Sequence, residues 1–166
     1  MKIRPAAPGD IHALVKLNRE AQAMHAEAYP GRFRQDASPE AVAGAFGLML
    51  ASPASCWLVA EVQNQTVAFL SAEFRQREEN WCQAAHRVCY LAGIVVDPGF
   101  RRQGIARALL DELKREGKQR GVPGIELDVW AFNSGARLAF AKLGFERIME
   151  RMSLVDDERG TAAGLE

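Results

Sequence analysis

Apolar residues recur every three or four positions in two segments of the first fifty residues, the spacing of a helix that buries one face. In the first helix, which Asp10 can cap, they are Ile11, Leu14, Leu17, Ala21 and Met24. In the second, with Ser38 as N-cap and Pro39 as the first helical residue, they are Val42, Phe46, Met49 and Leu50. A short strand at residues 2–4 precedes both helices, and the aromatic turn 29–34 separates them.

From residue 56 to residue 96 the pattern changes to that of strands. Residues 56–62 and 66–74 are rich in β-forming side chains and flank the polar triplet Gln63-Asn64-Gln65, which predicts a hairpin. The charged segment 75–85 predicts a loop. Residues 88–96 are almost entirely apolar, which predicts a strand covered on both faces.

The second half of the chain has a β-α-β-α-β pattern. A helix from Gly104 to about Gly121 is followed by a strand at 125–131. The parallel crossover between these strands is expected to be right-handed. A last helix starts at Asn133 or Ser134, ends at Gly144, and precedes a final strand at 145–155. The inward residues of the two helices are Ala106, Leu109, Leu110, Leu113 and Gly117, then Ala136, Ala139, Phe140 and Leu143.

Length and composition favour one soluble domain at residues 1–155 with a frayed polar tail at 156–166. The chain has 166 residues, 48% of them hydrophobic, and 21 basic residues balance 21 acidic ones. No apolar run approaches the ~20 residues of a membrane span, and no secretory leader is evident. Three cysteines without a CxxC pair predict a reduced, cytoplasmic protein that binds no metal. The zero net charge argues against a nucleic-acid partner.

The segment 95–106, VVDPGFRRQGIA, combines a buried strand, a turn and a helix that opens on glycine. A helix N-terminus leaves about four backbone N–H groups without partners and carries roughly half a positive charge. From Arg101 to Arg120 there are seven basic and three acidic residues, a local excess of four positive charges. The segment therefore predicts a phosphate site, although neither the P-loop nor the GxGxxG pattern is present.

Two motifs in this half of the chain resemble those of the GNAT superfamily of N-acetyltransferases. The first is Arg101-x-x-Gly104-x-Ala106, and the second is Asn133-x-x-Ala136-x-x-x-Phe140-x-x-x-Gly144-Phe145. The resemblance covers about residues 2–155. It implies an α+β (mixed α/β) fold, with a mostly antiparallel sheet of six to seven strands and helices on both faces. It also implies that strands four and five splay apart to admit acetyl-CoA.

The resemblance further implies how acetyl-CoA is held. Its pantetheine arm would bind along strand four like an added strand. Its pyrophosphate would bind the backbone N–H groups of residues 102–107. The residues predicted to contact the cofactor are Ile94, Val95, Val96, Arg101, Arg102, Gln103, Gly104, Ile105, Ala106, Arg107, Asn133 and Phe140.

The catalytic groups are less well indicated. Phe140 stands where many relatives have a tyrosine that is thought to protonate the departing thiolate, so Tyr90 is a substitute acid or simply a packed strand residue. Asp128 and Glu73 are alternative bases for the incoming amine, or structural carboxylates paired with neighbours. By family analogy, the acceptor pocket lies near His25, Glu27, Tyr29 and Phe33, and Trp81 and Trp130 belong either to that pocket or to the core.

These observations predict an enzyme that transfers an acetyl group from acetyl-CoA to a primary amine of a small molecule or peptide, by direct attack in a ternary complex. A non-catalytic acyl-CoA-binding regulatory module is the alternative, motivated by Phe140. The acceptor remains open among amino acids, polyamines, aminoglycosides, small amine drugs and peptide N-termini. A homodimer is compatible with the resemblance.

Overall fold

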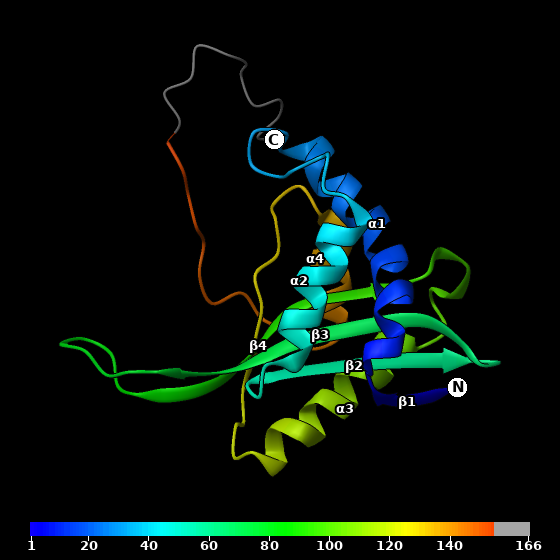
Figure 1. The fold of residues 1–166 in the computed structure, drawn as a ribbon. Coiled ribbons are helices and arrows are strands. Elements are labelled where there is room, and N and C mark those ends of the chain that lie inside the picture. The colour runs from blue at the N-terminus through cyan, green and yellow to red at the C-terminus, as the bar shows by residue number, and fades with distance from the viewer. Residues whose placement is uncertain (155–166) are drawn as a thin grey trace. The chain divides into compact units, whose positions relative to one another are not determined.

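The computed structural model describes residues 1–154 and divides the chain into two units, Met1–Phe132 and a second that begins at Asn133. The first contains five strands, three α-helices and two short 3-10 turns, shown in Figure 1. They are β1 (Lys2–Pro5), η1 (Pro8–Asp10), α1 (Ile11–Ala28), α2 (Pro39–Ala51), β2 (Ser55–Val62), β3 (Gln65–Arg77), β4 (His86–Val96), η2 (Pro98–Phe100), α3 (Ile105–Gln119) and β5 (Ile125–Glu126).

The five strands form one sheet in the order β1-β2-β3-β4-β5. The first four pair antiparallel, and β5 pairs parallel to β4 through only Cys89–Ile125 and Tyr90–Glu126. The mixed, mostly antiparallel sheet is therefore confirmed, and so is the parting of strands four and five. The strand count is lower than the predicted six to seven, because the structure pairs only these five among residues 1–154.

Helices cover both faces of the sheet, as expected. In Figure 1, α1 and α2 lie on one face and α3 lies on the other. Under α1 and α2 the core is a cluster of Leu14, Trp57, Val59 and Phe69, with Phe46 and Leu50 packed against it. On the opposite face α3 buries its predicted leucine stripe, Leu109, Leu110 and Leu113. The 3.6-residue spacing was thus sufficient to orient α3.

Three turns and caps follow the local chemistry of their residues. Gln63 and Asn64 both have positive φ, 50° and 62°, the backbone that a tight hairpin turn between β2 and β3 requires. Ser38 caps α2 by accepting from the Ala41 N–H at 3.2 Å. Asp10, expected to cap α1, occupies the N-cap position, but its side chain accepts no capping hydrogen bond from that helix. Its carboxylate instead accepts hydrogen bonds from both terminal nitrogens of Arg4, at 2.7 and 2.9 Å, and from the Ala7 N–H.

Burial of Asp10 makes this ion pair an important local constraint. Asp10 is only 8% exposed, so its charge needs a partner. The hydrogen bonds from Arg4 hold the pKa of Asp10 below its usual value, against the opposing effect of burial. The pair joins β1 to the start of α1.

Several predicted boundaries are wrong. Residues 127–131 and 145–154 form no strand. A strand is stabilised by ladder bonds and cross-strand contacts, which these segments lack in the described sheet, and Ile148, Met149, Met152 and Leu154 are exposed. Residue 155 and the predicted tail at 156–166 lie outside the described residues. Conversely, β3 continues through Arg77 into the predicted loop, because it pairs with β4 down to His86.

Strand β4 is not covered on both faces along its whole length. Val88, Cys89 and Leu91 are buried, whereas Ala92 is exposed and Ile94, Val95 and Val96 are half-buried. The change coincides with a bulge: Ser71 pairs with Gly93 and Ala72 with Leu91, so Ala92 has no partner. β4 loses cover at the point where β5 leaves it.

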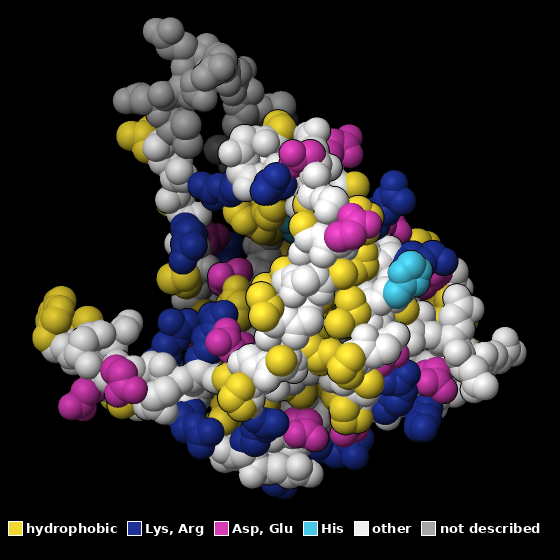
Figure 2. Space-filling view, viewed as in Figure 1, with side chains coloured by type: hydrophobic (Ala, Val, Ile, Leu, Met, Phe, Trp, Pro, Cys, Tyr) yellow, Lys and Arg dark blue, Asp and Glu magenta, His cyan; other side chains and the backbone are white. Residues whose placement is uncertain are grey.

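Helix α2 is apolar around its circumference and leaves part of that surface exposed. Leu48 and Met49 are 79% and 54% exposed, and Met24 of α1 is 38% exposed. Hydrophobic side chains accordingly gather over these two helices in the space-filling view of Figure 2. The inward positions predicted for Met24 and Met49 are therefore wrong, because both side chains are exposed. No helix within residues 1–154 is long and apolar enough to cross a membrane.

The second unit contains one helix, α4 (Ser134–Lys142), capped at both ends as predicted. The Asn133 side chain accepts from the Ala136 N–H at 3.0 Å. At the other end Gly144 has a φ of 94°. The Gly144 N–H donates to the Ala141 carbonyl, and the Phe145 N–H donates to the Phe140 carbonyl. This is a Schellman motif, and the Phe140 and Phe145 rings pack edge to face across it at 5.5 Å.

Candidate functional site

The predicted phosphate cradle has the backbone geometry of an anion site. After β4, Asp97 accepts the Gly99 N–H at 2.9 Å and shapes the η2 turn. Gly104 then takes the left-handed conformation, with a φ of 79°, as the N-cap of α3. No side chain caps this end of the helix. Its first N–H groups and its dipole are consequently available to a negatively charged ligand.

Glycine at position 104 has a specific physical role. A φ of 79° is strained for a residue with a side chain, and a Cβ placed there would project into open space rather than against another atom. Arg102 also has a positive φ, 63°, so the backbone turns sharply just before the helix.

The residues predicted to contact the cofactor near Gly104 differ in the hydrogen bonds and the exposure of their side chains. Arg101 is anchored, because its Nε donates to the Val96 carbonyl at 3.1 Å and its Nη2 pairs with Glu20 of α1 at 3.0 Å. Gln103 reaches back to the Gly99 carbonyl at 3.4 Å. Ile105 is buried and offers only its backbone, Ala106 is half-buried, and Arg102 and Arg107 are exposed.

The last residues of β4 form an edge where a ligand can pair. Ile94, Val95 and Val96 pair with Leu70, Phe69 and Ala68 of β3 on one side. On the other side, among the strands that the structure describes, β5 stops pairing at Tyr90. The edge therefore has the geometry for strand addition by an extended ligand.

The three predicted catalytic residues lie together at the start of this edge. The Tyr90 hydroxyl donates to Asp128 Oδ2 at 3.1 Å. Glu73 is the cross-strand neighbour of Tyr90, and its carboxylate pairs with Arg75 Nε at 2.8 Å. The Arg75 guanidinium in turn lies over the Tyr90 ring, 3.8 Å from its centroid. We call these four residues, Glu73, Arg75, Tyr90 and Asp128, the polar cluster.

Sequence reasoning missed Arg75. It lies in a segment taken for a charged loop, and only its place on β3, opposite Val88, brings it to the Tyr90 ring. The hydrogen bond between Tyr90 and Asp128 likewise depends on the short β4–β5 pairing, which joins residues 38 positions apart.

Three of the four predicted acceptor residues form a second cluster with aromatic rings from residues 130–132. His25 and Tyr29 contact Phe132, while Tyr29 and Phe33 contact Trp130. Ring centroids are 5.1–5.6 Å apart in these contacts and in the His25–Phe33 pair, a range typical of aromatic packing. We call His25, Tyr29, Phe33, Trp130 and Phe132 the aromatic cluster.

Other predicted residues are placed outside these clusters. Glu27 is exposed on α1, and Trp81 is 96% exposed in the β3–β4 loop, so Trp81 belongs neither to the core nor to the aromatic cluster. Asn133 and Phe140 belong to the second unit, and their contact with the cofactor stays a prediction.

The cysteines and the possible metal ligands within residues 1–154 form no cluster like the two described above. Burial raises the pKa of Cys56 to about 11 and that of Cys89 to about 12, so both thiols stay protonated at neutral pH. Within residues 1–154, no three His, Cys, Asp or Glu side chains come together to hold a metal ion.

A sheet that parts between strands four and five, followed by a helix with glycine at its N-cap, is the arrangement that the resemblance to the GNAT superfamily implies. The model of the acetyltransferase (GNAT) family matches residues 16–145, and the chain belongs to this family. The sequence-based family assignment is thus confirmed.

Individual relatives show the range within the family. The chain is 46% identical over 55 residues to the [ribosomal protein bS18]-alanine N-acetyltransferase of Escherichia coli K12, covering 33% of this chain and 37% of that protein. It is 30% identical over 88 residues to the aminoglycoside N(6')-acetyltransferase type 1 of Salmonella typhimurium, covering 53% and 60%. The matches thus span between about a third and three fifths of these proteins.

A solved structure from Clostridium acetobutylicum, described as a "predicted acetyltransferase with acetyl-CoA", shares the fold at a TM-score of 0.70. It is 25% identical, and the match covers 93% of this chain and 95% of that one.

Proposed function

We propose that this protein is an N-acetyltransferase that moves the acetyl group of acetyl-CoA to a primary amine by direct attack in a ternary complex. The observation that carries the proposal is the placement of the Tyr90–Asp128 hydrogen bond and the cradle at opposite ends of one exposed strand edge. From Val96 to Tyr90 a strand spans about 20 Å. A cofactor anchored by its pyrophosphate at Gly104 and extended along β4 would bring its thioester toward the polar cluster.

Backbone groups would provide most of the cofactor binding. The N–H groups at the start of α3 suit the pyrophosphate, and the edge of Ile94–Val96 suits the amide groups of pantetheine. Arg101 would act indirectly, because its bonds to Val96 and Glu20 hold the cradle loop against β4 and α1. Binding energy gained far from the thioester can be used to position it.

Asp128 is the better placed of the two candidate bases. The Glu73 carboxylate is already engaged by the Arg75 cation, whereas Asp128 is exposed and contacts a neutral hydroxyl. In the proposed reaction the ammonium group loses a proton to Asp128, directly or through water, and the free amine attacks the thioester carbonyl. The C–N bond forms, the C–S bond breaks, and the thiolate leaves.

Tyr90 is the proposed proton donor to that thiolate. Its hydroxyl lies beside Asp128, so the proton taken from the amine can be passed back through the pair to the leaving sulfur. The attacking nitrogen gives up its second proton to water. The products are therefore an N-acetyl amine, CoA with a free thiol and one released proton, and the pair returns to its starting protonation state. Backbone N–H groups of β4 near the Ala92 bulge are suited to stabilise the developing oxyanion.

The second candidate function is a non-catalytic acyl-CoA-binding regulatory module. The Phe140–Phe145 contact favours it, because a packed phenylalanine replaces the hydroxyl of many relatives. The two functions share the cradle and differ in whether the polar cluster performs chemistry.

One pair of measurements separates them. Calorimetry with acetyl-CoA tests the cradle, and release of CoA thiol with a panel of amines tests turnover. We expect binding and amine-dependent thiol release, with the N-acetyl product identified by mass spectrometry. Binding without product from any amine in the panel would favour the regulatory module, and absence of binding would contradict both.

A further inference from the structure

The aromatic cluster adjoins the polar cluster along one short segment of chain. Asp128 contacts Tyr90, Trp130 contacts Tyr29, and Phe132 contacts His25. Asp128 and Trp130 are two residues apart, so their Cα atoms are separated by no more than about 7 Å of chain. The proposed base and the Trp130 side chain are therefore attached to neighbouring points of the backbone.

The rings of this cluster are not sealed inside a core. Tyr29 is 40% exposed, and His25, Phe33, Trp130 and Phe132 are half-buried. The adjoining turn, residues 30–36, borders a hollow of about 440 Å³ that includes Phe33 in its wall. The hollow is largely open to solvent.

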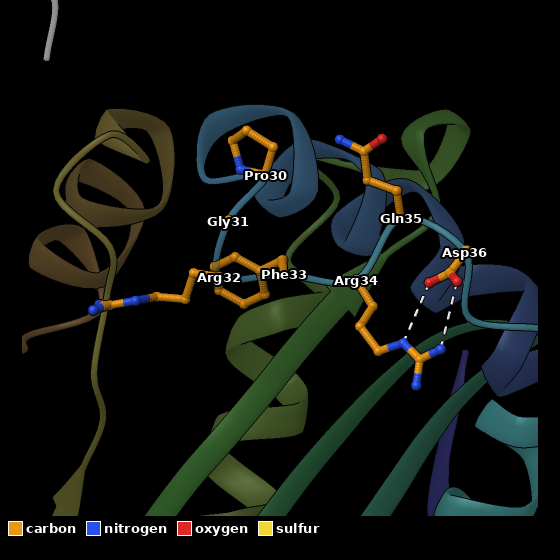
Figure 3. A pocket seen from close by; sticks show the side chains of 7 residues that line it. All are labelled: Pro30, Gly31, Arg32, Phe33, Arg34, Gln35 and Asp36. Carbon is orange, nitrogen blue, oxygen red and sulfur yellow. Dashed lines mark hydrogen bonds and ion pairs between the residues drawn. The ribbon is translucent and has the colours of Figure 1, made fainter. Parts of the chain in front are cut away.

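A planar group from the turn at residues 30–36, the guanidinium of Arg32, lies over the Trp130 ring. The Arg32 guanidinium lies 5.4 Å from the centre of the Trp130 ring. Figure 3 shows Arg32 and Arg34 turned to opposite sides of the turn, with Arg34 directed at Asp36. Arg32 is exposed and forms no ion pair with residues 1–154. A planar ligand can displace it from the ring face without breaking a salt bridge.

The charges near the site disfavour a polycationic acceptor. A molecule with several ammonium groups needs several free carboxylates, but Glu73 is neutralised by Arg75, and Arg32 adds a positive charge at the aromatic cluster. Within the polar cluster, Asp128 is the carboxylate left to receive an ammonium group.

We infer that the acceptor is an arylalkylamine: one primary amine joined by a short carbon chain to an aromatic ring that binds at Trp130, Tyr29 and Phe33. This inference rests on the proposed N-acetyltransferase function and names its substrate class. The amine would lie at Asp128 while the ring packs in the aromatic cluster, beside the hollow at residues 30–36.

The test compares amines of matched shape in the thiol-release assay. 2-Phenylethylamine is compared with 2-cyclohexylethylamine, which has the same skeleton without aromaticity, with propylamine, and with kanamycin as a polycation. We expect kcat/KM for 2-phenylethylamine to exceed that for the cyclohexyl analogue about threefold to tenfold, from aromatic pairing. We expect it to exceed that for propylamine at least tenfold, from burial of the ring.

Variants locate the preference. Trp130→Leu is expected to remove most of the preference for the aryl amine while acetyl-CoA affinity, measured by calorimetry, stays unchanged. Trp81→Leu is the matched control, because Trp81 is 96% exposed and outside the cluster, and it should leave the preference intact. If Trp130→Leu fails to fold in a thermal melt, Phe33→Leu in the surface turn replaces it.

The outcomes distinguish the two levels of the proposal. Equal or better turnover of propylamine, the cyclohexyl analogue or kanamycin overturns the arylalkylamine inference and leaves the acetyltransferase function standing. An aryl preference that survives both Trp130→Leu and Phe33→Leu overturns the assigned binding site. Acetyl-CoA binding with no product from any amine overturns the proposed function and, with it, the inference.

Discussion

The cradle and the polar cluster are built in different ways. The cradle consists of contiguous residues between Val96 and Arg107, and in the proposed function it binds the cofactor through the backbone N–H groups at the start of α3. The polar cluster combines side chains from β3, β4 and the segment after β5, and its central hydrogen bond joins residues 38 positions apart. A short motif can therefore specify the cradle, whereas the polar cluster requires the sheet to form in the right register.

This difference predicts separable effects on binding and turnover, and the largest concerns Asp128. Asp128→Asn keeps the shape and removes the negative charge, so turnover should fall ~10²–10⁴-fold, the usual range for loss of a general base. Acetyl-CoA affinity should stay the same, because the cradle lies at the other end of β4. Raising the pH should restore part of the activity, since more amine is then neutral. A pH–rate profile and calorimetry on the same variant measure both.

A purely structural Asp128 would show a different result. The melting temperature would fall, and higher pH would restore little activity. Turnover close to that of the unmodified protein at neutral pH would exclude Asp128 as the base and direct attention to Glu73.

A substitution at Gly104 is expected to affect cofactor binding first. Gly104→Asp places a carboxylate at the helix N-terminus in a left-handed conformation, so acetyl-CoA affinity should fall about 100-fold through repulsion of the pyrophosphate and loss of close approach. Gly121→Asp is the matched control, because Gly121 also has a positive φ, 68°, and open space around it, but lies past the other end of α3. Calorimetry should separate the two variants, and equal affinities would contradict the cradle.

A third change tests stability without touching either region. Asp10→Asn removes the carboxylate that Arg4 holds, which should lower the free energy of unfolding by about 2 kcal/mol at neutral pH. Because the folded-state pKa of Asp10 lies below its ordinary value of 3.8, its contribution is present above about pH 4 and lost as the pH falls further.

Denaturant unfolding at several pH values measures this contribution. The stability difference between the unmodified protein and Asp10→Asn should shrink in acid. Asp36→Asn, at an exposed ion pair with Arg34, is the control and should leave stability unchanged. A difference independent of pH would show that the Asp10 charge is unimportant.

The smallest effect is expected at Phe140, whose ring packs on Phe145 within the cap of α4. Phe140→Tyr is nearly isosteric and should change the free energy of unfolding by less than about 1.5 kcal/mol. If protonation of the thiolate limits the rate, turnover should rise. A tenfold fall in a stable variant that still binds acetyl-CoA would contradict the packing role and the proposed use of Tyr90.

Local patterns in the sequence were enough to predict the elements whose chemistry is short-range. Ser38, Asn133 and Gly144 lie at helix ends as their side chains or backbone freedom predict, and Gly104 lies at the start of α3 as predicted. The GNAT family and the mixed sheet were also evident from two motifs, because those motifs consist of contiguous caps and turns.

Only the tertiary structure revealed which side chains meet. Arg75 reaches the Tyr90 ring because β3 extends beyond its apolar stretch to pair with β4, and Trp130 meets Tyr29 and Phe33 because the chain leaves the sheet after Glu126. The same early departure removed the predicted strand at 127–131 and opened the edge of β4. Strand length and register depend on partners distant in sequence, so periodicity along one segment does not contain them.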